Sequence, residues 1–156
     1  MSDRFIGWTF VAIQVALLGA LIFLPGSDDW PTPQWLRTMG TIVNVLGFAL
    51  LIVGGLGLGS SLTPTPVPRE AGQLTTGGLY RFVRHPIYTG VLMIVVALVV
   101  SSGSWVHLVI GVVTVVFFSV KARWEEQRLR LEYPDYDVYA SSTGRFVPIP
   151  FRNRSR

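Results

Sequence analysis

Long apolar runs, each ended by polar residues, proline or glycine, dominate the chain. A hydrocarbon core of about 30 Å requires about 20 helical residues, and we looked for uncharged runs of that size. Four such runs predict membrane-spanning helices over residues 5–24, 36–61, 87–101 and 105–121. The pattern therefore predicts an all-α fold, a single integral-membrane domain with four transmembrane helices.

The third and fourth predicted spans lie within one apolar stretch. Residues 87–120 contain no Asp, Glu, Lys or Arg, and the main polar interruption is Ser101-Ser102-Gly103-Ser104. Serine and glycine clustered between apolar segments are typical of turns. We therefore expect two antiparallel helices joined by a tight turn, each near the short end of the spanning range.

A segment of 35 residues, 122–156, follows the last predicted span. Residues 121–132 are mostly strong helix formers and predict that the last helix extends into the cytoplasm until Pro134 ends it. Residues 133–151 are rich in aromatic side chains and proline, too apolar for a free linker. We expect them to fold back over the helix ends.

The composition agrees with a membrane protein. Only 14% of the residues are charged, against about 25% in soluble domains. The chain has no cysteine and only two histidines, His85 and His107, so we expect no metal site. The net charge of +4 does not indicate nucleic-acid binding, because the cations flank apolar runs and no nucleic-acid motif is present.

The distribution of cations predicts the orientation. Twelve of the thirteen Lys and Arg residues lie before the first span, between the second and third, or after the fourth, and only Arg37 lies on the other side. Cytoplasmic loops carry the excess of positive charge. We therefore expect both termini, and residues 62–86 and 121–156, on the cytoplasmic face.

Two clusters carry the candidate chemistry. The first surrounds the start of the third span, where Tyr80, His85 and Tyr88 lie close together in sequence. A structural explanation is available, with Pro86 at a helix start and tyrosines in an interfacial belt. A histidine at the membrane boundary can also donate to or accept from a ligand at neutral pH.

The second cluster is Lys121, Glu125 and Arg128, which share one face of a helix at four- and three-residue spacing. Salt bridging along the helix is one interpretation. Ionisable residues at the membrane boundary are also functional candidates, and we assign Lys121 and Glu125 as catalytic. Outside the clusters, Gly55 and Gly59 predict close helix approach, and we expect His107 to be structural.

At these clusters the chain resembles the membrane family of isoprenylcysteine carboxyl methyltransferases and phospholipid methyltransferases. The resemblance covers residues 70–150. It rests on Gly78-Leu79-Tyr80, on Arg84-His85-Pro86-Ile87-Tyr88-Thr89-Gly90, on Glu125-Glu126 with Leu129, and on Tyr136 with Tyr139.

The resemblance implies S-adenosylmethionine as cofactor and methylation of a lipid or prenylated small acceptor at the cytoplasmic face. The family's cofactor contacts correspond to Gln73, Leu74, Thr75, Tyr80, His85, Pro86, Ile87, Tyr88 and Glu125. Lys121 takes the place of a family arginine that serves the substrate, which removes the bidentate guanidinium.

Two other interpretations remain open. Sterol reductases have a similar C-terminal architecture but use NADPH, and their chains have more spans. A non-catalytic membrane subunit could keep the fold to bind a partner or lipid. The sequence does not indicate whether the methyl acceptor is a carboxylate or an amine, and it does not indicate the oligomeric state.

Overall fold

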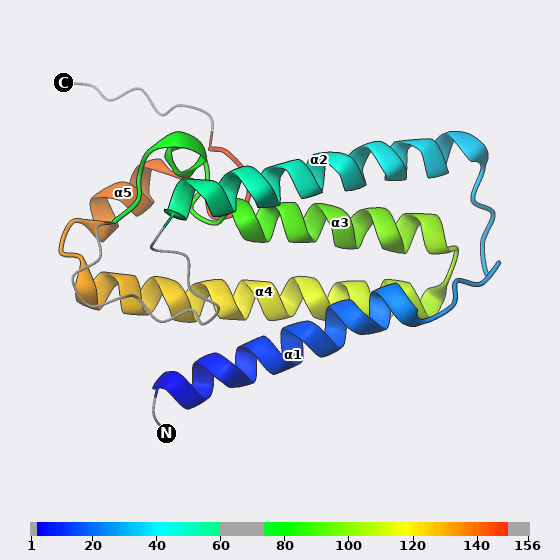
Figure 1. Ribbon diagram of the computed structural model, residues 1–156, viewed down its shortest axis with the longest axis horizontal. Helices are drawn as coiled ribbons and strands as arrows, with labels where there is room; N and C mark the ends of the chain where they lie inside the picture. The colour runs from blue at the N-terminus through cyan, green and yellow to red at the C-terminus, as the bar shows by residue number, and fades with distance from the viewer. Residues whose placement is uncertain (1–2, 60–73, 150–156) are drawn as a thin grey trace.

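The computed structural model describes residues 3–59 and 74–149, and the described chain is built from helices (Figure 1). Neighbouring long helices are antiparallel, and in the view of Figure 1 they follow the order α2, α3, α4, α1 across the bundle. The all-α fold predicted from the sequence is confirmed. The elements are α1 Asp3–Phe23, α2 Gln34–Leu58, the 3-10 helix η2 Gly78–Arg81, α3 Pro86–Ser102, α4 Trp105–Glu132 and α5 Tyr136–Ser142.

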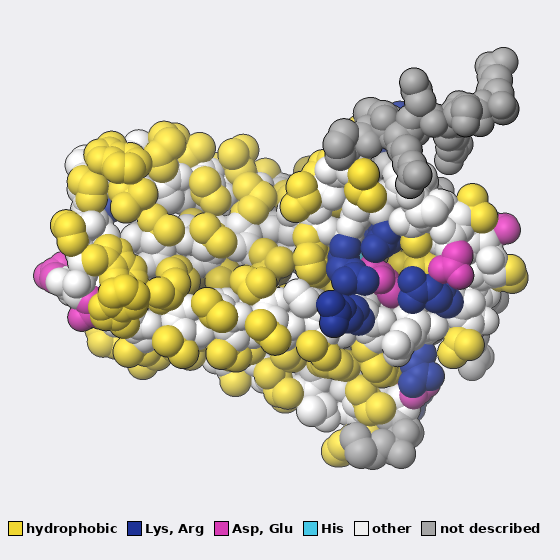
Figure 2. Space-filling model, turned by 180° about the vertical axis from the view of Figure 1, so that it is seen from behind, with side chains coloured by type: hydrophobic (Ala, Val, Ile, Leu, Met, Phe, Trp, Pro, Cys, Tyr) yellow, Lys and Arg dark blue, Asp and Glu magenta, His cyan; other side chains and the backbone are white. Residues whose placement is uncertain are grey.

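Three of the helices, α1, α2 and α4, are long and apolar enough to cross a membrane. Helix α3 is also apolar but has 17 residues, because Pro86 begins it and Gly103, in the left-handed conformation, follows its end. Figure 2 shows apolar side chains over most of the visible face, with Lys and Arg gathered near the end that carries α5. Such a broad apolar surface is rare on soluble proteins.

Glycines allow α2 and α3 to approach closely. Gly40, Gly47 and Gly54 recur every seven residues along the buried face of α2. A Cβ added at Gly47 would lie 2.8 Å from the carbonyl oxygen of Gly90 on α3. The sequence instead predicted close approach at Gly55 and Gly59, where an added Cβ would meet nothing within 4 Å in the described chain.

The predicted turn between the third and fourth helices is confirmed. Gly103 adopts φ +62° between α3 and α4, a conformation that glycine reaches without steric cost. The loop after α1 covers this turn, since the Asp29 amide donates to the Gly103 carbonyl at 2.9 Å. The Asp29 carboxylate also accepts the Trp105 amide at 2.8 Å at the start of α4.

The C-terminal segment folds back, as the sequence predicted. Helix α4 continues beyond its apolar part and ends at Glu132, two residues before Pro134. Helix α5 and the residues after it then return to the start of α3, where Thr89 Oγ1 donates to the Phe146 carbonyl at 2.9 Å. This return brings three parts of the chain together at one end of the bundle.

Candidate functional site

The loop that enters α3 begins with η2. Gly78 has φ +57°, which favours glycine, and Tyr80 is buried two residues later. The Tyr80 hydroxyl donates to the Gly54 carbonyl of α2 at 3.2 Å, while its own carbonyl accepts the Tyr139 hydroxyl at 2.5 Å. Burial raises the pKa of Tyr139 to about 12, so this donor stays protonated at neutral pH. Tyr80 therefore links α2 to α5.

His85 immediately precedes α3, and Pro86 is the first residue of that helix, as the sequence predicted. Proline suits this position because the missing N–H would have no partner within the helix. The backbone amides of Arg84 and His85 donate to the carbonyls of Gly144 and Arg145 at 2.8 and 3.1 Å. This short pairing fixes the entry loop against the C-terminal segment.

Glu126 on α4 is the centre of a buried ionic cluster, with a side chain 1% exposed. Arg145 donates to both of its carboxylate oxygens, at 2.9 and 2.6 Å, and Arg84 donates to Oε1 at 3.1 Å. His85 Nε2 lies 3.3 Å from the same oxygen. Burial alone would raise the pKa of Glu126, but the hydrogen bonds and positive charges outweigh it and hold the pKa well below its usual value.

Arg84 extends this cluster to the C-terminal segment. Its Nη1 donates to the Ala140 carbonyl at 2.7 Å and to the Thr143 carbonyl. The guanidinium therefore contacts Glu126 with one nitrogen and the end of α5 with another, a geometry that its planar group allows.

Glu125 has a different environment from its neighbour. The Tyr88 hydroxyl donates to Glu125 Oε2 at 2.8 Å, and His85 Nδ1 lies 3.7 Å from the same oxygen. The His85 and Tyr88 rings stack with centroids 5.1 Å apart and planes 3° from parallel. The Glu125 side chain is 26% exposed, and within the described residues no hydrogen bond reaches its Oε1. This carboxylate can therefore accept further donors.

Lys121 lies one helical turn before Glu125 and contacts the same tyrosine. Its Nζ is 5.1 Å from the Tyr88 ring centroid and donates to Gln14 Oε1 on α1 at 2.6 Å. Salt bridging among Lys121, Glu125 and Arg128, the alternative interpretation of this cluster, is not found in the described chain, where Arg128 pairs instead with Asp3 at 2.6 Å. Contacts with other helices replace pairs along α4.

Two of the other predicted cofactor residues contact a different helix. Pro86 and Ile87 face α2, because a Cβ added at Gly54 would lie 3.5 Å from Pro86 Cβ and 3.1 Å from Ile87 Cγ1. Leu74 and Thr75 are half-buried in the loop before η2, and Gln73 lies outside the described residues. The structure thus joins His85, Tyr88, Lys121 and Glu125, and directs the side chains of Pro86 and Ile87 elsewhere.

Comparison with known proteins gives the family. The model of the phospholipid methyltransferase family matches residues 35–135, which is more than half of the chain. The chain belongs to the phospholipid methyltransferase family. The matched region of this family runs from the first turn of α2 to just beyond α4 and includes Lys121, Glu125 and Glu126, whereas α1 and Arg145 lie outside it.

A curated relative is the nickel-cobalt-cadmium resistance protein NccN of Alcaligenes xylosoxydans xylosoxydans. It is 24% identical over 144 residues, which cover 92% of this chain and 64% of that protein. The chain therefore spans somewhat less than two thirds of the length of that relative.

Three residues of the candidate site were not singled out from the sequence. Glu126 was noticed only as part of a Glu-Glu pair, Arg145 lies far from both clusters in sequence, and Gln14 lies in the first span. A signal was available for Gln14, which is the only side-chain amide in the apolar run 5–24. For Arg145 no local signal exists, because its role depends on the return of the C-terminal segment.

In the described ranges, 3–59 and 74–149, no group of three or more His, Cys, Asp or Glu side chains is placed to hold a metal ion.

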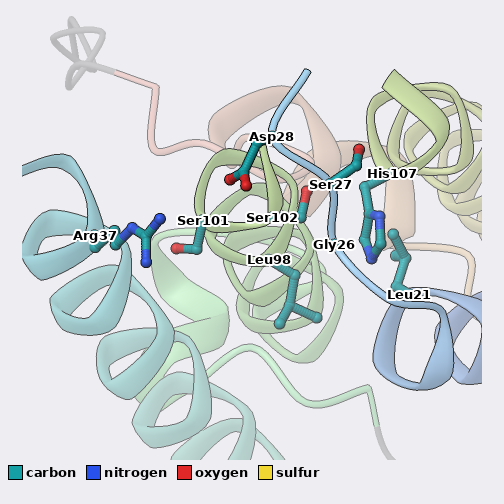
Figure 3. Close-up of a pocket in the computed structure, with 9 residues that line it drawn as sticks. All are labelled: Leu21, Gly26, Ser27, Asp28, Arg37, Leu98, Ser101, Ser102 and His107. Atoms are coloured by element: carbon teal, nitrogen blue, oxygen red, sulfur yellow. The ribbon is translucent and has the colours of Figure 1, made fainter. Parts of the chain in front are cut away.

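A separate open pocket of about 410 Å³ lies at the opposite end of the bundle (Figure 3). None of the predicted catalytic or cofactor-binding residues that the structure describes lines it. His107 is 3% exposed there, and its Nδ1 has no hydrogen-bond partner within the described chain. The lining residues are Leu21, Gly26, Ser27, Asp28, Arg37, Leu98, Ser101, Ser102 and His107.

Proposed function

We propose that the protein is an integral-membrane methyltransferase that uses S-adenosylmethionine to methylate a lipid or prenylated acceptor. Membership of the phospholipid methyltransferase family supports the reaction class. The observation that carries the proposal is the contrast between two adjacent carboxylates. Arg84, Arg145 and His85 enclose Glu126, whereas Glu125 is partly exposed and has Tyr88 as its hydrogen-bonding neighbour.

The residues around Glu125 fit the chemistry of this cofactor. A partly exposed carboxylate can accept hydrogen bonds from both hydroxyls of a ribose, and such charge-assisted bonds are strong. When bound, S-adenosylmethionine supplies a methyl group that its sulfonium makes electrophilic. The residues proposed to hold it are Tyr80, His85, Tyr88 and Glu125, with Gln73, Leu74 and Thr75 from the loop and the backbone of Pro86 and Ile87, whose side chains face α2.

Because the cofactor brings an activated methyl group, the protein residues mainly hold the two reactants, align them and exclude water. The buried ionic cluster around Glu126 helps to align the residues of the site, because it fixes the start of α3 and the C-terminal segment against α4. The stacked His85 ring holds Tyr88 so that its hydroxyl reaches Glu125. A carboxylate acceptor needs no base, whereas an amine must first lose a proton, and Glu125 and His85 are the groups in reach.

We further propose that α1 to α4 all cross the membrane and that both termini are cytoplasmic. Helix α3 is short, but it is apolar and packs along α2 and α4. Arg84, Arg128 and Arg145 lie at the end of the bundle where the candidate site is, and Arg37 lies at the other. The positive-inside rule then directs the candidate site to the cytoplasm.

Ligand binding tests this function. Purified protein in dodecyl maltoside is titrated calorimetrically with S-adenosylhomocysteine and, in parallel, with NADPH. We expect saturable binding of S-adenosylhomocysteine alone. Binding of NADPH alone would favour a reductase of the sterol-reductase type, and binding of neither by folded protein would favour a non-catalytic membrane subunit.

Variants test the site. We expect Glu125→Gln to weaken S-adenosylhomocysteine binding roughly tenfold or more, because hydrogen bonds to a charged group contribute about 1.5–3 kcal/mol. His85→Ala should weaken binding as well. Glu132→Gln, an identical change at an exposed position on α4, is the matched control, and His107→Ala is a second control at the far end. Unchanged affinity in both site variants would contradict the assignment.

A further inference from the structure

The pocket in Figure 3 lies at the end of the bundle opposite the candidate site, and all four long helices contribute to it. Its volume of about 410 Å³ falls within the range of pockets that hold small organic molecules. Side chains reach it from α1, α2, α3, α4 and the loop after α1, respectively Leu21, Arg37, Ser101, His107 and Asp28. Both charged groups and hydroxyl groups therefore face one opening.

The loop after α1 forms a fixed wall of this pocket. The Ser27 amide donates to the Ser102 carbonyl at 3.1 Å, and a Cβ added at Gly26 would lie 2.7 Å from the same oxygen. The Asp29 carboxylate accepts the Ser27 hydroxyl and the Trp105 amide at 2.7 and 2.8 Å. Because these bonds hold the loop against the ends of α3 and α4, the pocket is preformed.

Two opposite charges line the pocket without pairing with each other. Arg37 donates to Thr32 from Nε at 3.1 Å and from Nη2 at 2.7 Å, which fixes its guanidinium. A guanidinium has five N–H donors, so the end with Nη1 keeps donors for a ligand. In the ranges that the structure describes, neither Arg37 nor Asp28 has an ion-pair partner.

His107 adds a buried polar group to the same pocket. It is 3% exposed, and its Nδ1 has no hydrogen-bond partner within the described chain. The sequence predicted a structural role for this histidine, but apolar packing does not satisfy a ring nitrogen, and a buried polar atom without a partner is costly. An occupant of the pocket would offer the imidazole a partner after a rotation of the ring.

The arrangement of charge determines which ligand fits. One arginine balances the single charge of a carboxylate, whose two oxygens match the fork of a guanidinium. A phosphate dianion would add negative charge near Asp28 that Arg37 alone does not balance. Asp28 in turn attracts an ammonium. A ligand with both groups uses both unpaired charges.

We propose that this pocket binds a small zwitterion with one carboxylate and one ammonium, such as an amino acid. Its carboxylate contacts Arg37, its ammonium contacts Asp28, and His107 forms a hydrogen bond with it from the buried wall. The site is separate from the candidate site around Glu125, and it does not depend on the proposed methyltransferase function.

The two histidines of the chain allow a direct test. Histidine labelled with ¹³C at Cε1 gives one signal from His85 and one from His107, assigned by the loss of a signal in His107→Ala. Glycine, β-alanine and γ-aminobutyrate, which differ in the spacing of their charges, are titrated into the full chain in dodecyl maltoside. We expect at least one of them to shift the His107 signal saturably while the His85 signal stays in place. No saturable shift of His107 with all three would overturn the proposal.

Matched ligands separate a zwitterion site from a simple ion site. Butyrate and butylamine each keep one charged group of γ-aminobutyrate, and ethylamine and acetate do the same for glycine. Each should bind roughly tenfold more weakly than its zwitterion, because it loses one charge-assisted contact. A single-charge analogue that binds as tightly as the zwitterion would contradict the proposal.

Two variants test the assigned roles. Arg37→Gln should weaken zwitterion binding roughly tenfold or more, whereas Arg123→Gln, the same change at an exposed position on α4, should not. Asp28→Asn should weaken zwitterion binding and leave acetate or butyrate binding unchanged or tighter, since a repulsive charge is removed. Collapse of the pocket would weaken both ligand types together. Unchanged zwitterion affinity in Arg37→Gln and Asp28→Asn would overturn the assignment.

Discussion

Two neighbouring acids on α4 illustrate how position on a helix separates chemical roles. Consecutive helical residues point about 100° apart, so Glu126 faces the C-terminal segment and Glu125 faces Tyr88. Arginine donors saturate the Glu126 carboxylate, whereas the Glu125 carboxylate can still accept hydrogen bonds. We therefore expect Glu126 to contribute mainly to stability and Glu125 mainly to binding.

Thermal unfolding of the purified protein tests this division at the residue scale. Glu126→Gln leaves Arg84 and Arg145 without their shared counter-ion, and removal of one partner from a buried ion pair typically costs about 3–5 kcal/mol. We expect a clearly lower Tm at pH 7. Glu125→Gln, the same change one residue earlier, should lower the Tm far less.

The contribution of Glu126 also has a pH signature. Its folded-state pKa lies below the unfolded value of about 4.5, so its stabilising effect is complete above that pH and is lost as the pH falls further. The wild-type Tm should therefore decrease below about pH 4.5 more steeply than the Tm of Glu126→Gln. Parallel curves for the two proteins would contradict the ionic role.

At the scale of elements, the contact of α2 with α3 depends on missing side chains. Gly47 and Gly90 bring the two backbones together, since a Cβ at Gly90 would lie 2.6 Å from the Gly47 carbonyl oxygen. Close packing of this kind stabilises helix pairs where lipid provides no hydrophobic driving force. The same contact sets the position of Tyr80, whose hydroxyl reaches the Gly54 carbonyl.

Two Gly→Ala substitutions in α2 test the contact. At Gly47 the new Cβ would lie within 3 Å of the Gly90 carbonyl oxygen and of Ile94 Cγ1, and we expect a loss of about 1–3 kcal/mol. At Gly55 the Cβ meets no atom of the described residues within 4 Å, so the higher helix propensity of alanine should leave stability unchanged or raise it. The ranking of the two Tm values is the measurement, and equal values would contradict the packing argument.

At the scale of the whole molecule, apolar surface and charge are separated along the bundle. Apolar side chains cover most of the face shown in Figure 2, and the cations gather near the end that carries α5. Under the positive-inside rule, the proposed orientation places this charged end in the cytoplasm. In that proposed orientation the candidate site would open where the proposed water-soluble cofactor is available.

The absence of cysteine allows the orientation to be measured with single labels. Cysteine is introduced at exposed Ser141 in α5 or at exposed Asp28 in the loop after α1. In intact cells, we expect a membrane-impermeant maleimide to label Asp28→Cys and to spare Ser141→Cys until the membrane is opened. The reverse pattern would overturn the proposed orientation.

Several features followed from the sequence alone because local forces decide them. The apolar runs indicated where helices of membrane length occur, Pro86 marked the start of α3, and Ser101 to Ser104 marked the turn before α4. The motifs around His85 and Glu125 also indicated the family that the comparison confirmed. Each signal depends on residues close together in the chain.

Tertiary structure decided which of the candidate residues act together. Glu125 and Glu126 are equivalent in composition, and only the packing of Tyr88 and Arg145 distinguishes them. Gln14 reaches Lys121 across 107 positions of sequence. Gly47 rather than Gly55 forms the helix contact. The sequence did not predict this choice, because a repeat of small residues does not specify which face of the helix meets a neighbour. These choices depend on how helix faces meet in three dimensions, which local sequence patterns do not encode.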